Sequence, residues 1–310
     1  MIDSRMPRFG KPKIGKAIHV AQKKSLWLIT SVFRGFFILG MCFIILYPIL
    51  LRLSTSFMPL DDIYDMSVKY VPKSFTFDNY VRLWKLLDMG KAYLSTIVFC
   101  AAVAILQVAS SVLTGYGFAR FHFKGKGPLF AVVLLGLILP PDLTLVPIYT
   151  MFSKVNLIDN PLAFIILSAG GAGIKSGLYI FMMRQYYRGM PKELEEAAFI
   201  DGAGLFRTFV KIMLPASRTM MTTIFLFSFV WQWLDVSYSS VFFDRFPVIT
   251  NTLMRIKSMT VTVNTGIGSA SELSLLKNAG ILYLVVPLIL FYIFAQRHFV
   301  ESIERSGLVG

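Results

Sequence analysis

The chain has 310 residues, of which 55% are hydrophobic, 15% are aromatic and only 15% are charged. Soluble domains carry charge on about a quarter of their residues, so this composition excludes an ordinary soluble protein and indicates an integral membrane protein. The net charge of +14 does not indicate a nucleic-acid-binding protein, because the basic residues are spread over several loops and an N-terminal arm instead of forming one patch.

The arm, residues 1–32, is basic and contains Pro and Gly. Residues 10–17 nearly match a phosphate-binding loop, but Ala17 stands where that motif needs a Ser or Thr hydroxyl to reach magnesium. We therefore expect no nucleotide site in this chain, and no cofactor of its own.

Apolar runs of membrane-spanning length follow the arm and predict an all-α, polytopic membrane protein with six transmembrane helices. The predicted transmembrane domain covers residues 33–300, followed by a tail at 301–310. The third run is broken by Pro140 and Pro141, which should kink it, and the fourth is rich in glycine, which permits close helix crossing. The expected spans are 33–51, 92–118, 129–151, 161–183, 220–243 and 281–297.

Residues 184–218 separate the fourth and fifth runs and predict a polar helical hairpin. Pro191 suits a first helical position, and acidic residues in the next turns suit the positive end of the helix dipole. Gly202 is a suitable residue to end that helix. The acidic first helix, with its narrow stripe of small side chains, favours docking to a protein partner. The alternative is an amphipathic loop lying on the bilayer.

The hairpin resembles the EAA loop of membrane subunits of ABC importers, through Glu196-Ala197-Ala198, Asp201-Gly202-Ala203 and Leu214-Pro215. In that family the loop is a pair of coupling helices that sits in a cleft of the ATP-hydrolysing subunit. The resemblance implies an ABC importer type I permease fold. The residues that it assigns to ATPase coupling are Glu195, Glu196, Ala197, Ala198, Asp201, Gly202, Leu214 and Pro215.

Three further segments, 72–80, 115–126 and 296–310, are similar to one of the two permeases of maltose-type carbohydrate importers. The resemblance implies a second related permease, two ATP-binding subunits that hold ATP and magnesium, and an extracytoplasmic solute-binding protein. The solute would be an oligosaccharide or a modified sugar. The alternatives are a non-sugar solute, a stand-alone secondary transporter, which should show an inverted repeat, or a membrane scaffold.

Loop charge predicts the orientation. Nineteen Lys and Arg residues fall on the face of the arm, the hairpin and the tail, against eleven on the other face. Because cytoplasmic loops carry the excess of basic residues, we expect both termini and the hairpin in the cytoplasm of a bacterial inner membrane, with lipid around the spans.

Ionisable residues inside the spans are expected to face an interior or a cavity, since each costs about 2.5–3.5 kcal/mol in the bilayer centre. We expect a solute path there, because aromatic faces and amide or carboxylate acceptors suit a polyhydroxylated solute. The alternative is a structural Asp–Lys pair involving Lys175, with tryptophans at the headgroups. Neither a metal-ligand spacing nor a nucleophile motif is found, so the chain is not expected to be an enzyme. The candidate path residues are Asp142, Trp231, Gln232, Trp233 and Asp235.

Overall fold

A computed structural model describes residues 14–65, 67–68, 70–258 and 269–307, and all the regular structure in these residues is helical. The first part of the predicted arm, residues 1–13, and part of the last predicted outside segment, 259–268, lie outside the described residues. The helices in chain order are α1 (Ile14–Ser56), α2 (Leu60–Tyr64), α3 (Asp78–Leu86), α4 (Met89–Arg120), α5 (Lys126–Ile138), α6 (Pro141–Lys154), α7 (Leu162–Ala169), α8 (Ser176–Gly189), α9 (Glu193–Ile200), α10 (Leu205–Thr208), η1 (Phe209–Met213), α11 (Leu214–Ala216), α12 (Arg218–Trp233), α13 (Ser237–Phe242), α14 (Ile249–Ser258) and α15 (Ala270–Gly307).

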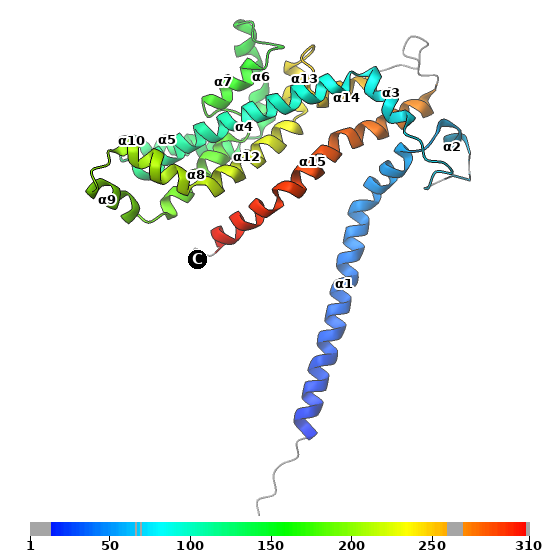
Figure 1. Cartoon of the computed structure of the whole chain (residues 1–310), viewed down its shortest axis with the longest axis horizontal. Helices are drawn as coiled ribbons and strands as arrows, with labels where there is room; N and C mark the ends of the chain where they lie inside the picture. Colours follow the sequence, from blue (N-terminus) through cyan, green and yellow to red (C-terminus); the bar gives the residue numbers. More distant parts are fainter. Residues whose placement is uncertain (1–13, 66, 69, 259–268, 308–310) are drawn as a thin grey trace, which may run out of the picture.

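Helix α4 is the centre of the bundle, with its most extensive contacts to α8, α12 and α7 (Figure 1). Its buried apolar side chains join aromatic residues of α7, α12 and α13 in one core, in which Phe99 packs edge-on against Phe164 and Phe243 at ring-centroid distances of 5.4 Å. Aromatic pairs of this geometry contribute beyond the area that they bury. The core therefore fixes α4 as the element against which the others are positioned.

Among the residues that the structure describes, three helical stretches are long and apolar enough to cross a membrane: Trp27–Ser56, Met89–Arg120 and Ala270–Gln296. Two bent pairs of helices raise the number to five if each pair is one span. The pair formed by α5 and α6 is bent by 106° at Pro140, so the predicted kink is confirmed. The predicted fourth span is divided into α7 and α8 by a break at residues 170–175. The number of six spans stays a prediction.

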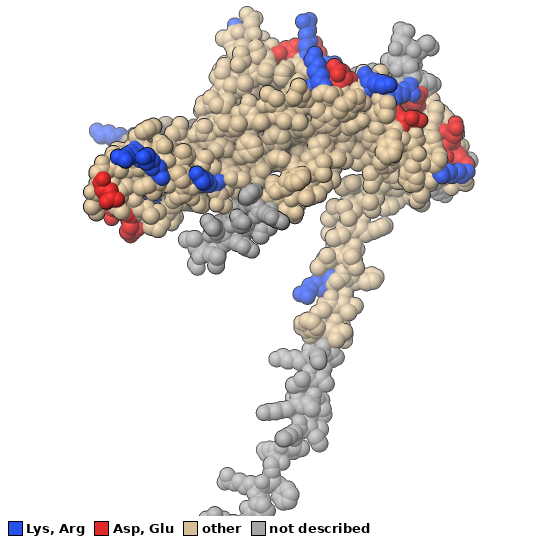
Figure 2. Space-filling model, in the orientation of Figure 1, with Lys and Arg blue, Asp and Glu red and all other residues tan. Residues whose placement is uncertain are grey.

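Charged side chains on the face shown in Figure 2 gather over the hairpin end of the bundle and over the opposite end, around α2, α3 and the loops near α13. The surface between carries few charged side chains. This distribution fits a bundle whose ends meet water and whose middle meets hydrocarbon.

Helix α1 extends away from the bundle (Figure 1). The C-terminal end of α1 packs against the bundle, through contacts with α15. None of its most apolar stretch is buried inside the chain. Phe36, for example, is 79% exposed. This helix therefore needs lipid or another chain to cover it.

Asp159 joins two loops at the end of the bundle opposite the hairpin. Its Oδ1 accepts backbone N–H bonds from Asp244, Arg245 and Phe246 at 3.1, 2.9 and 2.9 Å. Burial alone would raise the pKa of this carboxyl, but the three N–H donors outweigh burial and lower the pKa. The stabilisation is therefore present above the ordinary carboxyl pKa and is lost as the pH falls through the lowered one.

Gly115 sets how closely α4 can approach α8. A Cβ at this position would lie 2.5 Å from Cβ of Met183 and 3.0 Å from the backbone N of Arg184, whereas Gly117, two residues later, has open space. We expect Gly115→Ala to lower the free energy of unfolding by about 1–3 kcal/mol through overpacking. Gly117→Ala should leave it unchanged or slightly raised. Melting temperatures of the purified variants test this, and equal values for both would contradict it.

Candidate functional site

The hairpin between α8 and α12 begins with α9, which ends as the sequence predicts. Gly202 has φ +79°, its N–H bonds to the carbonyl of Phe199, and the N–H of Ala203 bonds to that of Ala198 at 2.9 Å. These two bonds around a left-handed residue form a Schellman cap. A Cβ at Gly202 would meet nothing within 4 Å, so the backbone conformation alone requires glycine here.

The tip of the hairpin presents apolar side chains to the outside of the chain. Ile200 is 86% exposed, Phe206 80% and Leu205 57%. Ala198 on the opposite face of α9 is buried, whereas Glu196, Ala197 and Asp201 are exposed. Exposed apolar residues ringed by polar ones mark interaction sites in proteins.

A buried ion pair fixes α9 to the end of α4. Arg120 Nε lies 2.8 Å from Glu195 Oε2, and both side chains are about nine-tenths buried. Tyr116, one turn before Arg120, donates its hydroxyl hydrogen to Glu195 Oε1 at 2.7 Å. Arg120 Nη2 donates to the backbone carbonyl of Met190 at 2.9 Å. Both carboxylate oxygens of Glu195 and two nitrogens of the Arg120 guanidinium therefore have close polar contacts.

Aromatic contacts extend this joint to the second half of the hairpin. The ring of Tyr116 lies 4.7 Å from that of Phe209 in η1 and 5.3 Å from that of Tyr187 in α8, measured between centroids. The hydroxyl of Tyr187 is 3.0 Å from Ser217 Oγ. The hairpin is thus packed onto α4 and α8 as one body.

The last two predicted coupling residues, Leu214 and Pro215, begin the short helix α11. The preceding turn, η1, is a π-helix. Proline has no N–H to donate to the carbonyl four residues earlier and its ring would clash there, so a wider turn before Pro215 is the expected response. Leu214 is half-buried and Pro215 exposed.

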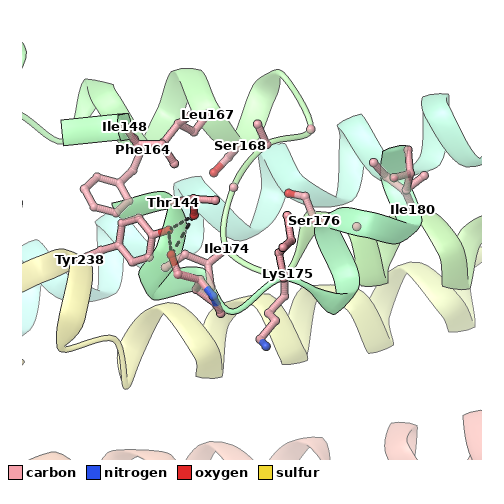
Figure 3. Close-up of a pocket in the computed structure, with 18 of the residues that line it drawn as sticks. Thr144, Ile148, Phe164, Leu167, Ser168, Ile174, Lys175, Ser176, Ile180 and Tyr238 are labelled. Carbon is pink, nitrogen blue, oxygen red and sulfur yellow. Dashed lines mark hydrogen bonds between the residues drawn. The ribbon is translucent and has the colours of Figure 1, made fainter. Parts of the chain in front are cut away.

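A cavity of about 360 Å³ lies deeper in the bundle, at the level where both α5–α6 and α7–α8 are broken. Figure 3 shows Thr144 of α6 and Tyr238 of α13 joined by a hydrogen bond of 2.8 Å at one side of it. Irregular backbone at membrane depth is tolerated where protein or a wet cavity satisfies its polar groups. The residues from the breaks that line the cavity are Leu139, Gly171, Ala172, Gly173, Ile174 and Lys175.

The three consecutive predicted path residues of α12 point in different directions. Gln232 is buried, lines the cavity, and its Nε2 has no hydrogen-bond partner among the described residues. Trp231 is 47% exposed and lies under the ammonium group of Lys175, 4.8 Å from the ring centroid. Trp233 is buried, stacks on Phe229, and donates from Nε1 to the carbonyl of Leu284. Gln232 alone of the three lines the cavity.

The two predicted path carboxylates lie outside the cavity lining. Asp142 is exposed in the first turn of α6. Asp235 is bound to the start of α13, where it accepts hydrogen bonds from the backbone N–H of Tyr238 at 3.1 Å and of Ser239 at 2.8 Å. That position satisfies free N–H groups of the helix. Lys175, discussed above as one half of an Asp–Lys pair, contacts Trp231.

Comparison with known proteins gives the class of this bundle. A family model described as "binding-protein-dependent transport system inner membrane component" matches residues 111–305, which include the hairpin, the Arg120–Glu195 pair and the cavity. The chain belongs to this family. The resemblance to permease subunits of ABC importers is thereby confirmed, and the protein is a multi-pass membrane permease component.

Individual relatives of this permease cover most of both chains. It is 29% identical to the probable ABC transporter permease YurM of Bacillus subtilis, over 86% of this chain and 84% of the relative. It is 27% identical to the arabinooligosaccharides permease AraQ of Halalkalibacterium halodurans, over 92% and 96%. It is 25% identical to the maltodextrin permease MalD of Streptococcus pneumoniae, over 90% and 95%.

A solved structure supports the predicted fold of the permease. A chain of a bacterial ABC transporter involved in import of the acidic polysaccharide alginate superposes with a TM-score of 0.74. The match covers 90% of this chain and 98% of the other, at 20% identity. The predicted all-helical importer-permease fold is confirmed.

The sequence did not reveal the partners of Glu195. It is one of three glutamates in the first turns of α9, and nothing in its spacing separates it from Glu193 and Glu196. The available signal is on α4, where Tyr116 and Arg120 are four residues apart and therefore share a helix face. An arginine and a tyrosine on one face at a helix end require an acceptor, and the hairpin supplies it.

Proposed function

We propose that this permease is one of two related membrane subunits of an ATP-driven importer. Two ATP-binding subunits would hold ATP and magnesium, and an extracytoplasmic protein would deliver the solute. The observation that carries the proposal is the hairpin, whose apolar tip is exposed while its base is held by a buried ion pair. A rigid element with an uncovered apolar tip fits a docking role better than a free loop does.

The proposed coupling runs through this hairpin from the cytoplasmic side. Movement of an ATPase cleft that holds Ile200 and Phe206 would displace α9, and the Arg120–Glu195 pair would pass that displacement to α4. Because α4 packs against α7, α8 and α12, a shift of α4 would reach both helix breaks around the cavity. Such rigid-body shifts of packed helices are a common form of switching.

A second permease is supported by α1, whose apolar stretch is uncovered within this chain. In the proposed complex a related subunit would cover part of this stretch. Lipid would cover the sides of the helix that the second subunit does not contact.

The proposed solute is an oligosaccharide or a modified sugar. The names of AraQ, MalD and the melibiose/raffinose/stachyose permease MelC of Bacillus subtilis describe sugar transport. A further relative, GgtD of Synechocystis, is named for osmoprotective compounds, so a non-sugar solute is the second candidate. A stand-alone secondary transporter is disfavoured by the family match, which covers the hairpin.

Co-purification of the tagged permease from its native membrane tests the proposal. We expect a second permease and an ATPase in the same complex, with ATP turnover raised by the sugar-loaded binding protein. Recovery of the chain alone, with transport that follows a proton or sodium gradient, would overturn the proposal.

A further inference from the structure

The cavity between the broken helices offers donors without matching acceptors. Gln232 is 4% exposed, and its Nε2 has no partner among the described residues. The hydroxyl groups of Thr144 and Tyr238 lie 2.8 Å from each other and from the carbonyl oxygen of Pro141, so both are already engaged in hydrogen bonds. A buried donor left without an acceptor is unfavourable, so a ligand atom that accepts from Gln232 is favoured.

The lining of the cavity also includes a positively charged residue. Lys175 lines it and extends from the start of α8 toward α12, the helix that carries Gln232 (Figure 3). The first residues of α8, Ser176 and Gly177, also line the cavity, so the positive end of that helix dipole faces it. Among the described residues of the lining no carboxylate is present.

In the part of the chain that the structure describes, the close contacts of Lys175 do not include a negative charge that would balance its ammonium group. The described residues give it one close contact, the Trp231 ring at 4.8 Å. A cation–π contact offsets only part of the cost of removing an ammonium group from water. Its backbone is also held at φ 62°, a conformation that disfavours side chains other than glycine. Strained residues of this kind gather at ligand sites.

We infer that this cavity binds a carboxylate-bearing sugar, with Lys175 and Gln232 as the residues that recognise the carboxylate. The inference rests on the proposed function and narrows its solute class from sugars in general to acidic ones. The ammonium group supplies a charge-assisted hydrogen bond to one oxygen and the Gln232 amide a second bond.

The test compares sugars that differ in one group. The complex that co-purifies with the tagged chain is placed in nanodiscs of phosphatidylcholine, which carries no net charge. Binding of glucuronate and galacturonate is compared with that of glucose and galactose, in which a hydroxymethyl group replaces the carboxylate. We expect about tenfold tighter binding of at least one uronate than of its neutral sugar, and a loss of this preference in high salt.

Variants assign the preference to the cavity. Lys175→Met should weaken uronate binding about tenfold and leave neutral sugars unaffected, while Lys175→Arg should retain the preference because the charge remains. Methionine and arginine must adopt the same left-handed backbone conformation at position 175 as lysine does. The variants and the wild type therefore carry the same backbone strain. Gln232→Leu should weaken uronate binding as well. Lys154→Met, at the exposed end of α6, is the control for the loss of one positive charge and should bind like the wild type.

Three outcomes overturn the inference: no uronate preference, a preference that survives Lys175→Met, or no binding of either sugar class. A fourth is that nanodiscs with phosphatidylglycerol retain that lipid through Lys175 and lose uronate binding, which would assign the site to a lipid headgroup. ATPase activity is measured on the same preparation. An active, sugar-stimulated complex without uronate preference contradicts this inference alone, whereas absence of the ATPase contradicts the proposed function.

Discussion

Exchanging Glu195 for arginine will abolish solute uptake, because the change places a second positive charge against Arg120 in a buried site. Removing one partner of a buried ion pair costs about 3–5 kcal/mol, and reversing its charge adds repulsion. Uptake is measured in cells that lack the natural copy of the chain, with the amount in the membrane determined by immunoblotting. ATP hydrolysis by the purified complex distinguishes a variant that has lost coupling from one that has lost the ATPase subunit.

Two variants make this expectation specific to the pair. Glu193→Arg changes an exposed glutamate two residues earlier on α9 and should retain near-normal uptake. The double exchange Arg120→Glu with Glu195→Arg restores opposite charges and should recover part of the uptake, limited by the Met190 carbonyl that Arg120 now binds. Normal uptake by Glu195→Arg alone would show that the pair has no role in coupling.

Replacing Gly202 by valine will also abolish uptake while the chain still inserts into the membrane. The position has φ +79° and open space around it, so the valine meets no neighbour but cannot hold the left-handed conformation without a cost of about 1–2 kcal/mol or more. The cap of α9 then reopens and the apolar tip loses its geometry. Uptake and membrane content are measured as for Glu195.

The matched control is Gly204, which has an extended backbone, with φ −75° and ψ 166°, and equally open surroundings. Valine suits that backbone, so Gly204→Val should transport normally. Gly202→Asn should recover uptake in part, since asparagine tolerates the left-handed region. Equal uptake by Gly202→Val and Gly204→Val would contradict the assigned role of the cap.

Glu196→Lys tests docking without altering the fold. The side chain of Glu196 is exposed on α9, so the change should leave insertion and stability intact. Loss of uptake together with loss of the ATPase from the purified complex is the expected result, and normal uptake would remove Glu196 from the proposed interface.

Local features of this fold follow from the sequence, and long-range ones do not. The end of α9 at Gly202 and the break at Pro140 each depend on one residue and its neighbours. The Arg120–Glu195 pair joins residues 75 positions apart, with four helices between them, so it depends on how α4 and α8 pack. Gly115, which permits that packing, is recognisable in the sequence only as a small residue.

The substrate-path prediction shows a similar limit. Trp231, Gln232 and Trp233 are adjacent in sequence, but successive residues of a helix turn by about 100°, so three in a row cannot share one face. Helical geometry alone indicates that one of them would line a path and another would face the core. Which residue lines the path depends on how α12 packs against α15, where Trp233 donates a hydrogen bond to the Leu284 carbonyl.

The joint between α4 and α9 has a consequence for biosynthesis. Arg120 leaves the ribosome 75 residues before Glu195, and translation at roughly 5–20 residues per second makes that interval several seconds long. During this time the guanidinium lacks its Glu195 partner, and we expect the end of α4 to be accessible to quality-control proteases. Formation of the Arg120–Glu195 pair requires α5 to α8 to be in place, so we expect the first half of the nascent permease to become more resistant to degradation once the pair has formed.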